Sequence, residues 1–271
     1  MVFQSHRRSL GLKPTHPLVS ALILGLTLSV TLFGQPAMAQ IGNRPDLGDA
    51  PASNNNFGVG MQWFPGSPFN AQFPTVFFAG AQPTGPRHNN SPTVYFLGNS
   101  GAGGTITCEN QADVGADCDG PNNINPPANT PNQDLGDDGP VWGTLGAING
   151  CPTKTYTYYV TSLAAGTTTA YVNSWYDFNQ SGFWGNTFAC SSTVTVDEWI
   201  VKNQVITLAP GVNVFTTPPF PAAQNTSSNP RWVRISLSES PLPLASAAAR
   251  RGSGPAQGWR LGETEDYRLP N

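Results

Sequence analysis

The chain has 271 residues, a formal net charge of −3 and only 11% charged residues. Its 29 glycines and 26 prolines exceed ordinary usage and fit one all-β domain with long Gly/Pro/Asn-rich loops. The acidic balance argues against nucleic acid as a partner.

The first 39 residues have the order of a secretory signal peptide. Arg7, Arg8 and Lys13 precede an apolar run over residues 18–33, and Ala37-Met38-Ala39 supplies a small-x-small cleavage site. We therefore predict export, with the mature chain beginning at Gln40. The Arg7-Arg8 pair is also a feature of twin-arginine export signals. Gly11 stands where that signal usually has an apolar residue, which favours the general secretory route.

Residues 40–271 are predicted to form a single domain, loop-rich over 40–140 and strand-rich over 141–271. This part keeps ten Lys and Arg residues against all 16 Asp and Glu residues, a net charge of −6. It contains no apolar stretch long enough to span a bilayer, so we expect no membrane span after the signal is removed.

The loop-rich part carries too many aromatic residues for a disordered linker. We expect ordered loops packed over a sheet, a short strand over 75–79 and another over 93–97. His88 is the only histidine outside the signal peptide, and a lone histidine is more often a hydrogen-bonding structural residue than a ligand. The aromatic residues are Trp63, Phe64, Phe69, Phe73, Phe77 and Phe78.

Four cysteines remain after export, at positions 108, 118, 151 and 190. An even count in an exported chain favours disulfides, and four cysteines allow three pairings. We choose Cys108–Cys118 together with Cys151–Cys190. A four-cysteine zinc site would need closely spaced pairs, which the chain lacks.

An acidic segment follows at residues 134–139, Asp-Leu-Gly-Asp-Asp-Gly, and it includes Asp137. Oxygen-rich loops of this kind suit a hard cation such as calcium. They are also ordinary turn chemistry, and both interpretations stay open.

From residue 153 onward the chain is rich in Thr, Val, Ile, Tyr and Trp, with Gly, Pro or Asn between the runs. Short strands in this number favour a β-sandwich. Val233, Ile235 and Leu237 alternate with polar residues, which predicts one buried face. We expect an exposed, mobile loop over 241–257, and strands over 153–162, 168–176, 192–196, 199–208, 212–217, 231–238 and 259–269.

The segment after the 168–176 strand places oxygens at alternate positions, Asp177, Asn179 and Ser181, before Gly182. This is the spacing of the first half of an EF-hand loop, but Phe188 stands where the closing glutamate would be. A calcium ion here would need a remote carboxylate. The alternative is a turn stabilised by the aspartate and asparagine side chains.

The last strand reads Gly-Glu-Thr-Glu-Asp-Tyr-Arg-Leu over residues 262–269. Alternation in a strand places Glu263 and Glu265 on one face, and Thr264 and Asp266 on the other. Two like charges side by side need a cation, an arginine or open solvent. We weigh calcium, shared with Asp177, against ion pairing with one of four arginines: Arg231, Arg234, Arg260 or Arg268.

These motifs resemble those of the GEVED domain family, a module of secreted bacterial proteins. The likeness rests on the terminal run, on the Asp177 segment with Trp175 before it, on Asp-Leu-Gly-Asp-Ala-Pro at 46–51 and on the 134–139 segment. The resemblance implies an immunoglobulin-like β-sandwich but no single activity. Thr264 replaces the usual small apolar residue, and residues 52–130 are hard to align.

We expect a non-catalytic extracellular or cell-surface module with a structural or adhesive role, stabilised by calcium, whose partner is a cell-surface protein or a polysaccharide. A carbohydrate-binding module is the alternative, with Trp63, Trp142 or Trp184 stacking on sugars. A hydrolase using a carboxylate pair is the third, although no common hydrolase motif is present.

Overall fold

The computed structural model describes residues 46–52, 60–77, 80, 83–89, 94–100, 124–125, 128–129, 138–224 and 229–269, apart from 49 and 65. The signal peptide, Cys108, Cys118 and Asp137 lie outside these residues. All the elements described below belong to one unit, residues 37–271.

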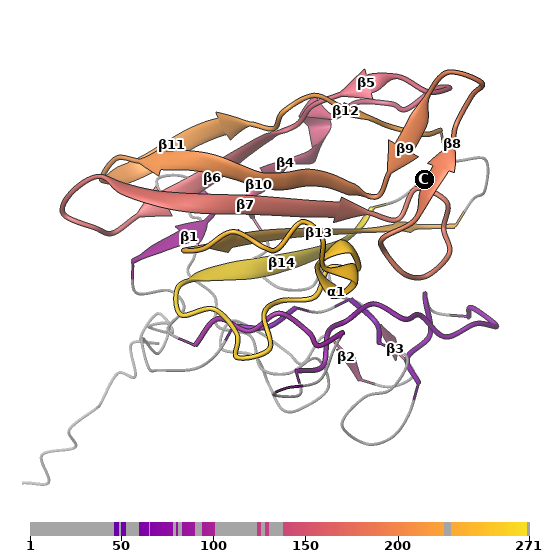
Figure 1. Cartoon of the computed structure of the whole chain (residues 1–271), viewed down its shortest axis with the longest axis horizontal. Coiled ribbons are helices and arrows are strands. Elements are labelled where there is room, and N and C mark those ends of the chain that lie inside the picture. The colour runs from indigo at the N-terminus through magenta and orange to yellow at the C-terminus, as the bar shows by residue number, and fades with distance from the viewer. Residues whose placement is uncertain are drawn as a thin grey trace, which may run out of the picture. The chain divides into compact units, whose positions relative to one another are not determined.

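Two four-stranded antiparallel sheets form most of the fold (Figure 1). In the first, β6 (Thr157–Ser162) lies between β1 (Tyr95–Leu97) and β11 (Gly211–Thr216), and β4 (Pro140–Val141) also pairs with β6. The second has the order β10, β7, β13, β14. Its strands are β7 (Thr168–Tyr176), β10 (Trp199–Leu208), β13 (Arg231–Ser238) and β14 (Gly262–Leu269).

Shorter elements connect these strands. Three two-stranded sheets pair β5 (Thr153–Lys154) with β12 (Phe220–Pro221), β8 (Thr187–Ala189) with β9 (Thr195–Asp197), and β2 (Ile124–Asn125) with β3 (Ala128–Asn129). Among the described residues, the helical elements include a 3-10 turn, η3 (Trp142–Thr144), and α1 (Ala247–Arg250). Neither these nor any other described helix has the length and apolar character needed to cross a membrane. The predicted all-β class is confirmed.

The main hydrophobic core joins residues of both large sheets. Tyr158 and Val160 of β6 are in one buried cluster with Val172 of β7 and Ile235 of β13. The period-two alternation of these strands explains the arrangement, because alternate side chains of one strand lie on the same face. Aliphatic and aromatic residues at these positions remove a large apolar area from water, which stabilises the two sheets against each other.

A second core covers the opposite face of the β10-β7-β13-β14 sheet. Trp175, Trp199 and Trp232 project from the strands and cluster with Trp63 and Phe73 of the first described loops. In Figure 1 these indigo-to-purple loops lie beside β13 and β14, on the side away from β6 and β11. The expectation that β13 has one buried face is therefore wrong, because loops cover the second face and all eight residues of the strand are buried.

Several predicted elements match the structure closely. The strands predicted at 168–176, 199–208 and 231–238 are β7, β10 and β13 with the same bounds. The strand predicted at 259–269 begins later, at Gly262. The short strand expected at 75–79 is not formed over its described part, residues 75–77.

The 241–257 segment is exposed at residues 241, 243–245 and 247, as expected, but Leu242, Ala249 and residues 252–254 are buried, which corrects the expectation of a fully exposed loop. Ser246 caps α1, accepting a hydrogen bond from the Ala249 N–H at 3.2 Å. Leu242 and Ala249 belong to the second core, and Ser253 is fully buried. The low sequence complexity of this segment concealed its apolar contacts.

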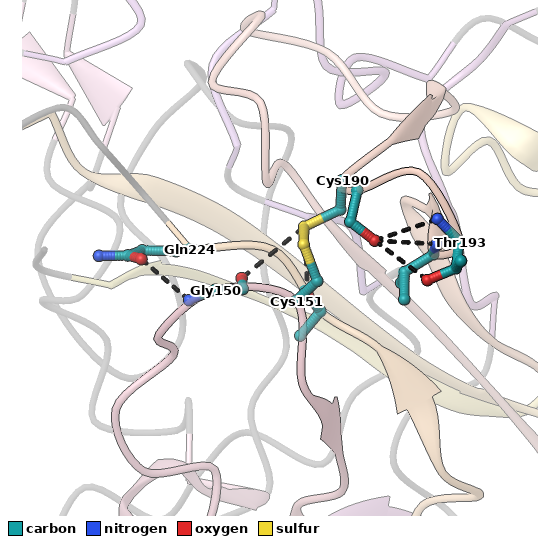
Figure 2. Close-up of a disulfide and its surroundings, with 8 residues drawn as sticks. Gly150, Cys151, Cys190, Thr193 and Gln224 are labelled. Carbon is teal, nitrogen blue, oxygen red and sulfur yellow. Dashed lines mark hydrogen bonds between the residues drawn. A yellow bond between two sulfur atoms is a disulfide. The ribbon is translucent and has the colours of Figure 1, made fainter.

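The predicted Cys151–Cys190 disulfide is confirmed (Figure 2). It joins the segment before β5 to the turn between β8 and β9, with the two Cα atoms 5.9 Å apart. Its loop closes 39 residues of sequence, which constrains the unfolded chain and so favours the folded state. The predicted Cys108–Cys118 bond lies outside the described residues.

Candidate functional site

Strand β14 contains the acidic run, and its side chains alternate as predicted. Glu263 is opposite Leu237 and Glu265 is opposite Ile235, so both acids share the face that carries the main core. Thr264 and Asp266 are opposite Ser236 and Arg234 on the other face. All four side chains are buried, so neither face meets its charge in open solvent.

One face contains a buried ion pair. The Arg234 guanidinium forms a fork on the Asp266 carboxylate, with Nε 2.7 Å from Oδ1 and Nη2 2.5 Å from Oδ2. Both side chains have 0% exposure. Arg234, one of the four arginines considered from the sequence, therefore forms an ion pair with β14. Its partner is Asp266 and not Glu263 or Glu265.

The same ion pair gathers distant segments of the chain. Arg234 Nη1 donates to the carbonyl oxygens of Pro74 at 2.6 Å and Gly252 at 2.8 Å. The Ala50 N–H donates to Asp266 Oδ2 at 2.7 Å. A buried charge pair is tolerable only when its remaining donors and acceptors are satisfied, and here backbone groups from three loops satisfy them. The pair therefore attaches the loops to the sheet.

On the opposite face, the described partners of the two glutamates are backbone N–H groups and a tyrosine hydroxyl. Glu263 accepts a hydrogen bond from the Leu97 N–H, and Glu265 Oε1 accepts from the N–H groups of Asp138 at 3.1 Å and Gly139 at 3.2 Å. The Tyr267 hydroxyl donates to Glu265 Oε2 at 2.8 Å. These bonds fasten β1 and the segment before β4 to the last strand.

Burial also changes the acidity of the two glutamates. It raises the pKa of Glu263 well above its usual value, with the nearby Glu265 and Asp46 acting in the same direction. Burial, and then the charge of Asp138, raise the pKa of Glu265 to about 8. At neutral pH Glu265 therefore favours the uncharged form, and burial shifts Glu263 in the same direction, which reduces the repulsion between them.

The Asp177 segment forms a turn that the aspartate itself holds. Asp177 Oδ1 accepts from the Ser181 N–H at 2.9 Å, and Oδ2 accepts from the Gly182 N–H at 3.0 Å. Asn179 Oδ1 also accepts from the Ser181 N–H, at 3.0 Å. Gln180 and Gly182 have φ angles of 55° and 78°, so the chain reverses through the left-handed region. This is the side-chain-stabilised turn weighed as the alternative to calcium.

A second carboxylate, Glu198, completes this turn and was missed from the sequence. It is fully buried and accepts from the Asn186 N–H at 2.9 Å and the Asn179 N–H at 3.4 Å. Burial raises the pKa of Asp177 to about 7 and that of Glu198 to about 8, where Asp177 is the second cause. No local pattern marks Glu198, because its partners are 12 and 19 residues away.

The structure does not bring Asp177 together with the glutamates of β14. The Asp177 N–H bonds to the Trp232 carbonyl, and Trp232 is opposite Arg268, three residues beyond Glu265. Asp177 is therefore level with Arg268 but two strands away from it, and Glu265 lies three residues from Arg268 along β14. At ordinary strand spacing and rise per residue, the Cα atoms of Asp177 and Glu265 are about 14 Å apart. Register also puts Asp177 on the tryptophan face and Glu265 on the main-core face. One ion shared by the two groups is therefore inconsistent with this arrangement.

The described residues also offer a poor fit for calcium at either place. Both carboxylate oxygens of Asp177 already accept backbone N–H groups, and Ser181 Oγ donates to the Phe183 carbonyl oxygen at 3.1 Å. Within the described ranges, no group of three or more His, Cys, Asp or Glu side chains has the geometry to hold a metal ion. Asp137, the remaining candidate ligand, lies outside those ranges.

His88 has the structural role that the sequence favoured. Its Nδ1 is 2.9 Å from the Leu261 carbonyl oxygen, so that nitrogen carries the proton, and Nε2 is 2.9 Å from Thr264 Oγ1. The ring stacks on Trp259 with centroids 4.8 Å apart. Burial is the main reason that the pKa of His88 falls to about 4. The neutral ring thus fixes a loop against β14.

All seven tryptophans lie within the described residues, and their burial bears on the sugar-binding alternative. Trp63 is 7% exposed and Trp184 is fully buried, so neither offers an open stacking face. The Trp184 indole N–H donates to the Trp232 carbonyl oxygen at 3.2 Å, and the Trp232 indole donates to Trp63. Trp142 alone of the three candidates keeps an intermediate exposure.

Family models, curated proteins and solved structures were each compared with this chain, and none of the three comparisons gave a match. The likeness to the GEVED family therefore stays an expectation drawn from the motifs.

Proposed function

We propose that this chain is a non-catalytic extracellular or cell-surface module with a structural or adhesive role. The observation that carries the proposal is the use made of the motif residues. Asp266, Arg234 and His88 are buried and hydrogen-bonded to backbone groups of other segments, and buried Asp177 holds the backbone of its own turn. Because these motif residues hold loops in place, they support a role that depends on a fixed surface and not on a catalysed reaction.

Export is part of this proposal. The basic start, the apolar run and the Ala37-Met38-Ala39 site support removal of residues 1–39. The Cys151–Cys190 disulfide adds weak support, because such bonds persist in oxidising compartments. N-terminal sequencing of secreted protein should begin at Gln40. Full-length protein retained in the cytoplasm would contradict export.

An immunoglobulin-like sandwich is the finer fold that we propose. Two four-stranded antiparallel sheets that share one core support it, as does the resemblance of the motifs. An experimental structure of the mature chain tests the strand connections. A closed barrel would refute this architecture.

Calcium stabilisation stays a prediction of the acid-rich motifs, although the Asp177 loop is satisfied by its own hydrogen bonds. Thermal unfolding with millimolar calcium and with chelator provides the test. An ion that binds only the folded state raises the free energy of unfolding by about 2.7 kcal/mol at a hundredfold its Kd. Equal melting temperatures in calcium and in chelator would remove calcium from the proposal.

The hydrolase alternative receives less support from the geometry. Its candidate carboxylate pairs, Asp177 with Glu198 and Glu263 with Glu265, have exposures of 0–1%. A substrate would need to reach such a pair through the packed loops. Sugar binding is favoured by one specific observation, the partly exposed Trp142 ring that lines a cavity of about 370 Å³.

A further inference from the structure

The strand at one end of the first large sheet, β11, pairs with β6 and with no other described strand (Figure 1). Val214 of β11 is opposite Tyr159 of β6. The Tyr159 N–H and C=O bond on the far side of β6, to Gly139 and Gly98. Bonded and non-bonded residues alternate along an antiparallel pair, so the backbone groups of Val212 and Val214 point away from β6. Among the described residues, no hydrogen bond reaches them, and this edge of the sheet is open.

The side chains along this edge are apolar and uncharged. Val212 is 42% exposed and Val214 is 58% exposed, while Phe215 packs against the main core, so the two valines lie on the outer face of the sheet. No charged residue occurs over residues 203–230 or in β6. Valine, phenylalanine and threonine, which favour extended backbone, make up most of β11. The edge is therefore a template to which another strand can add.

Two other edges of the large sheets are covered by side chains of this chain. In β1, on the opposite side of the first sheet, the Leu97 N–H donates to the Glu263 carboxyl group. In β14, at the end of the second sheet, the Thr264 N–H donates to Asp46 Oδ2 at 2.7 Å. Carboxyl oxygens thus occupy backbone donors that a foreign strand would need.

The edge at β10 is protected by its irregular backbone and by a charge. Its register against β7 shifts twice, Asn203 has a left-handed φ of 51°, and Lys202 is exposed. Bulges and lysines are common protection against strand addition. On β11 the one comparable contact among the described residues lies at its end, where Gln204 Nε2 donates to the Thr216 carbonyl oxygen at 2.9 Å. The fold thus protects three edges and leaves most of β11 open.

We propose that β11 is a self-association edge, at which the β11 strands of two copies pair antiparallel about a two-fold axis. Such a pair is self-complementary, because each strand offers the same outward N–H and C=O groups to the other. The distribution of charge favours a second copy of this chain. Residues 40–271 carry ten Lys and Arg against 16 Asp and Glu, yet two copies meet no like charge along residues 203–230. A different protein would find no charged side chain there to recognise.

The geometry also limits the assembly to two copies. Each copy uses its one open edge among the described strands of the large sheets, so no equivalent edge is left for a third. Pro210 and Pro218 flank β11 and have no N–H to extend the ladder. The pair joins two sheets into one and covers the exposed valines. The inference goes beyond the proposed structural or adhesive role, which would stand for a monomer.

Sedimentation velocity of the purified chain, with its disulfide intact, tests the proposal between about 1 µM and about 1 mM. We expect monomer at the low end and dimer at the high end, because one strand pair is a small interface. Val214→Lys should raise the dimer Kd by at least about 10-fold, since like charges then meet near the axis. The control Val205→Lys makes the same change at a valine that is 62% exposed and should leave the Kd unchanged. Val205 lies on the far face of the second sheet, because its neighbour Ile206 is in the main core.

A charge exchange tests the two-fold symmetry. Val214→Glu alone should also be monomeric, and an equal mixture with Val214→Lys should restore the dimer, because opposite charges then lie on the same face of the paired strands. Val214→Pro removes an N–H that bonds nothing in a single copy. It should weaken dimerisation and leave a cooperative melt, which separates strand pairing from simple contact between valine side chains.

A chain that stays monomeric at about 1 mM would overturn the proposal, even if a foreign peptide adds to the edge. Equal weakening by Val205→Lys, or a Lys and Glu mixture that stays monomeric, would overturn it as well. The variants are compared where they melt cooperatively. Val212→Lys, at a valine that is 42% exposed, makes the same change on the same edge and decides the matter if Val214→Lys does not fold.

Discussion

The two faces of strand β14 accommodate buried acidic side chains in different ways. On one face Asp266 meets the Arg234 guanidinium in a fully buried fork. On the other, Glu263 and Glu265 meet backbone N–H groups and a tyrosine hydroxyl, and burial favours their uncharged forms. Acids one residue apart in sequence thus differ in chemistry, because alternation sends them into different surroundings.

The largest expected effect comes from breaking the paired face. Asp266→Asn leaves the Arg234 charge buried without its carboxylate, which should lower the free energy of unfolding by about 3–5 kcal/mol. Urea denaturation at pH 7 measures the change. The double variant Asp266→Leu with Arg234→Met should lose less than the sum of the single variants, because it removes both charges together. A loss below about 1 kcal/mol in Asp266→Asn would mean that the fork contributes little.

A matched pair of glycine variants compares the packing of the two faces. A Cβ on Gly48 would lie 2.7 Å from both Arg234 Nη2 and Asp266 Oδ2, and one on Gly139 would lie 2.7 Å from Glu265 Oε2. Each alanine should cost about 1–3 kcal/mol through overpacking. We expect Gly48→Ala to cost more, since it also separates charges. A lower melting temperature for Gly139→Ala than for Gly48→Ala would reverse the comparison.

The glutamate face should weaken as pH rises. Folding raises the pKa of Glu265 from 4.5 to about 8, so across this window the folded chain holds a proton that the unfolded chain releases. The free energy of unfolding should fall with pH, by up to about 1.4 kcal/mol per unit for one such proton. Glu265→Gln should flatten this fall in urea titrations from pH 5 to 8, while the surface control Asp197→Asn should not. A slope unchanged by Glu265→Gln would contradict the raised pKa.

The paired face should show a smaller effect of opposite sign, through His88 on Thr264. Its pKa drops from 6.5 to about 4 on folding, so its contribution is complete above pH 6.5 and is lost as pH falls toward 4. His88→Gln keeps hydrogen-bonding groups but cannot take up the proton, and it should flatten the acid side of the stability profile. Equal acid sensitivity in the variant and the wild type would exclude His88 as a cause.

Local patterns predicted the strands well, because alternation and composition depend only on residues that are close together in the sequence. The bounds of β7, β10 and β13 and the two faces of β14 all follow from such patterns. The pairing of Cys151 with Cys190, predicted from the exported compartment and the even cysteine count, is also present.

What the sequence did not predict depends on contacts between distant residues. The Ala50 N–H reaches Asp266 across 216 residues, and the indole N–H of Trp232 reaches Trp63 across 169. Such contacts bury the second face of β13 and place Glu198 under the Asp177 turn, and no periodicity in either segment announces them. The shared calcium site was predicted from two incomplete ligand sets, the Asp177 segment and the glutamates of β14. Nothing in either segment indicates that the fold keeps them apart.

The packing of the 241–257 segment has a consequence for proteolysis. Arg250-Arg251 reads as a dibasic cleavage site, yet Arg250 is bonded to Asp197 and Thr187, and the Arg251 guanidinium lies over the Phe183 ring, 5.2 Å from its centroid. Gly252 follows with a φ of 83° and lies against Trp184. A protease needs an extended backbone, so trypsin should cut here only when the segment opens locally. The rate of cleavage at this site therefore measures how often the segment opens locally, separately from global unfolding.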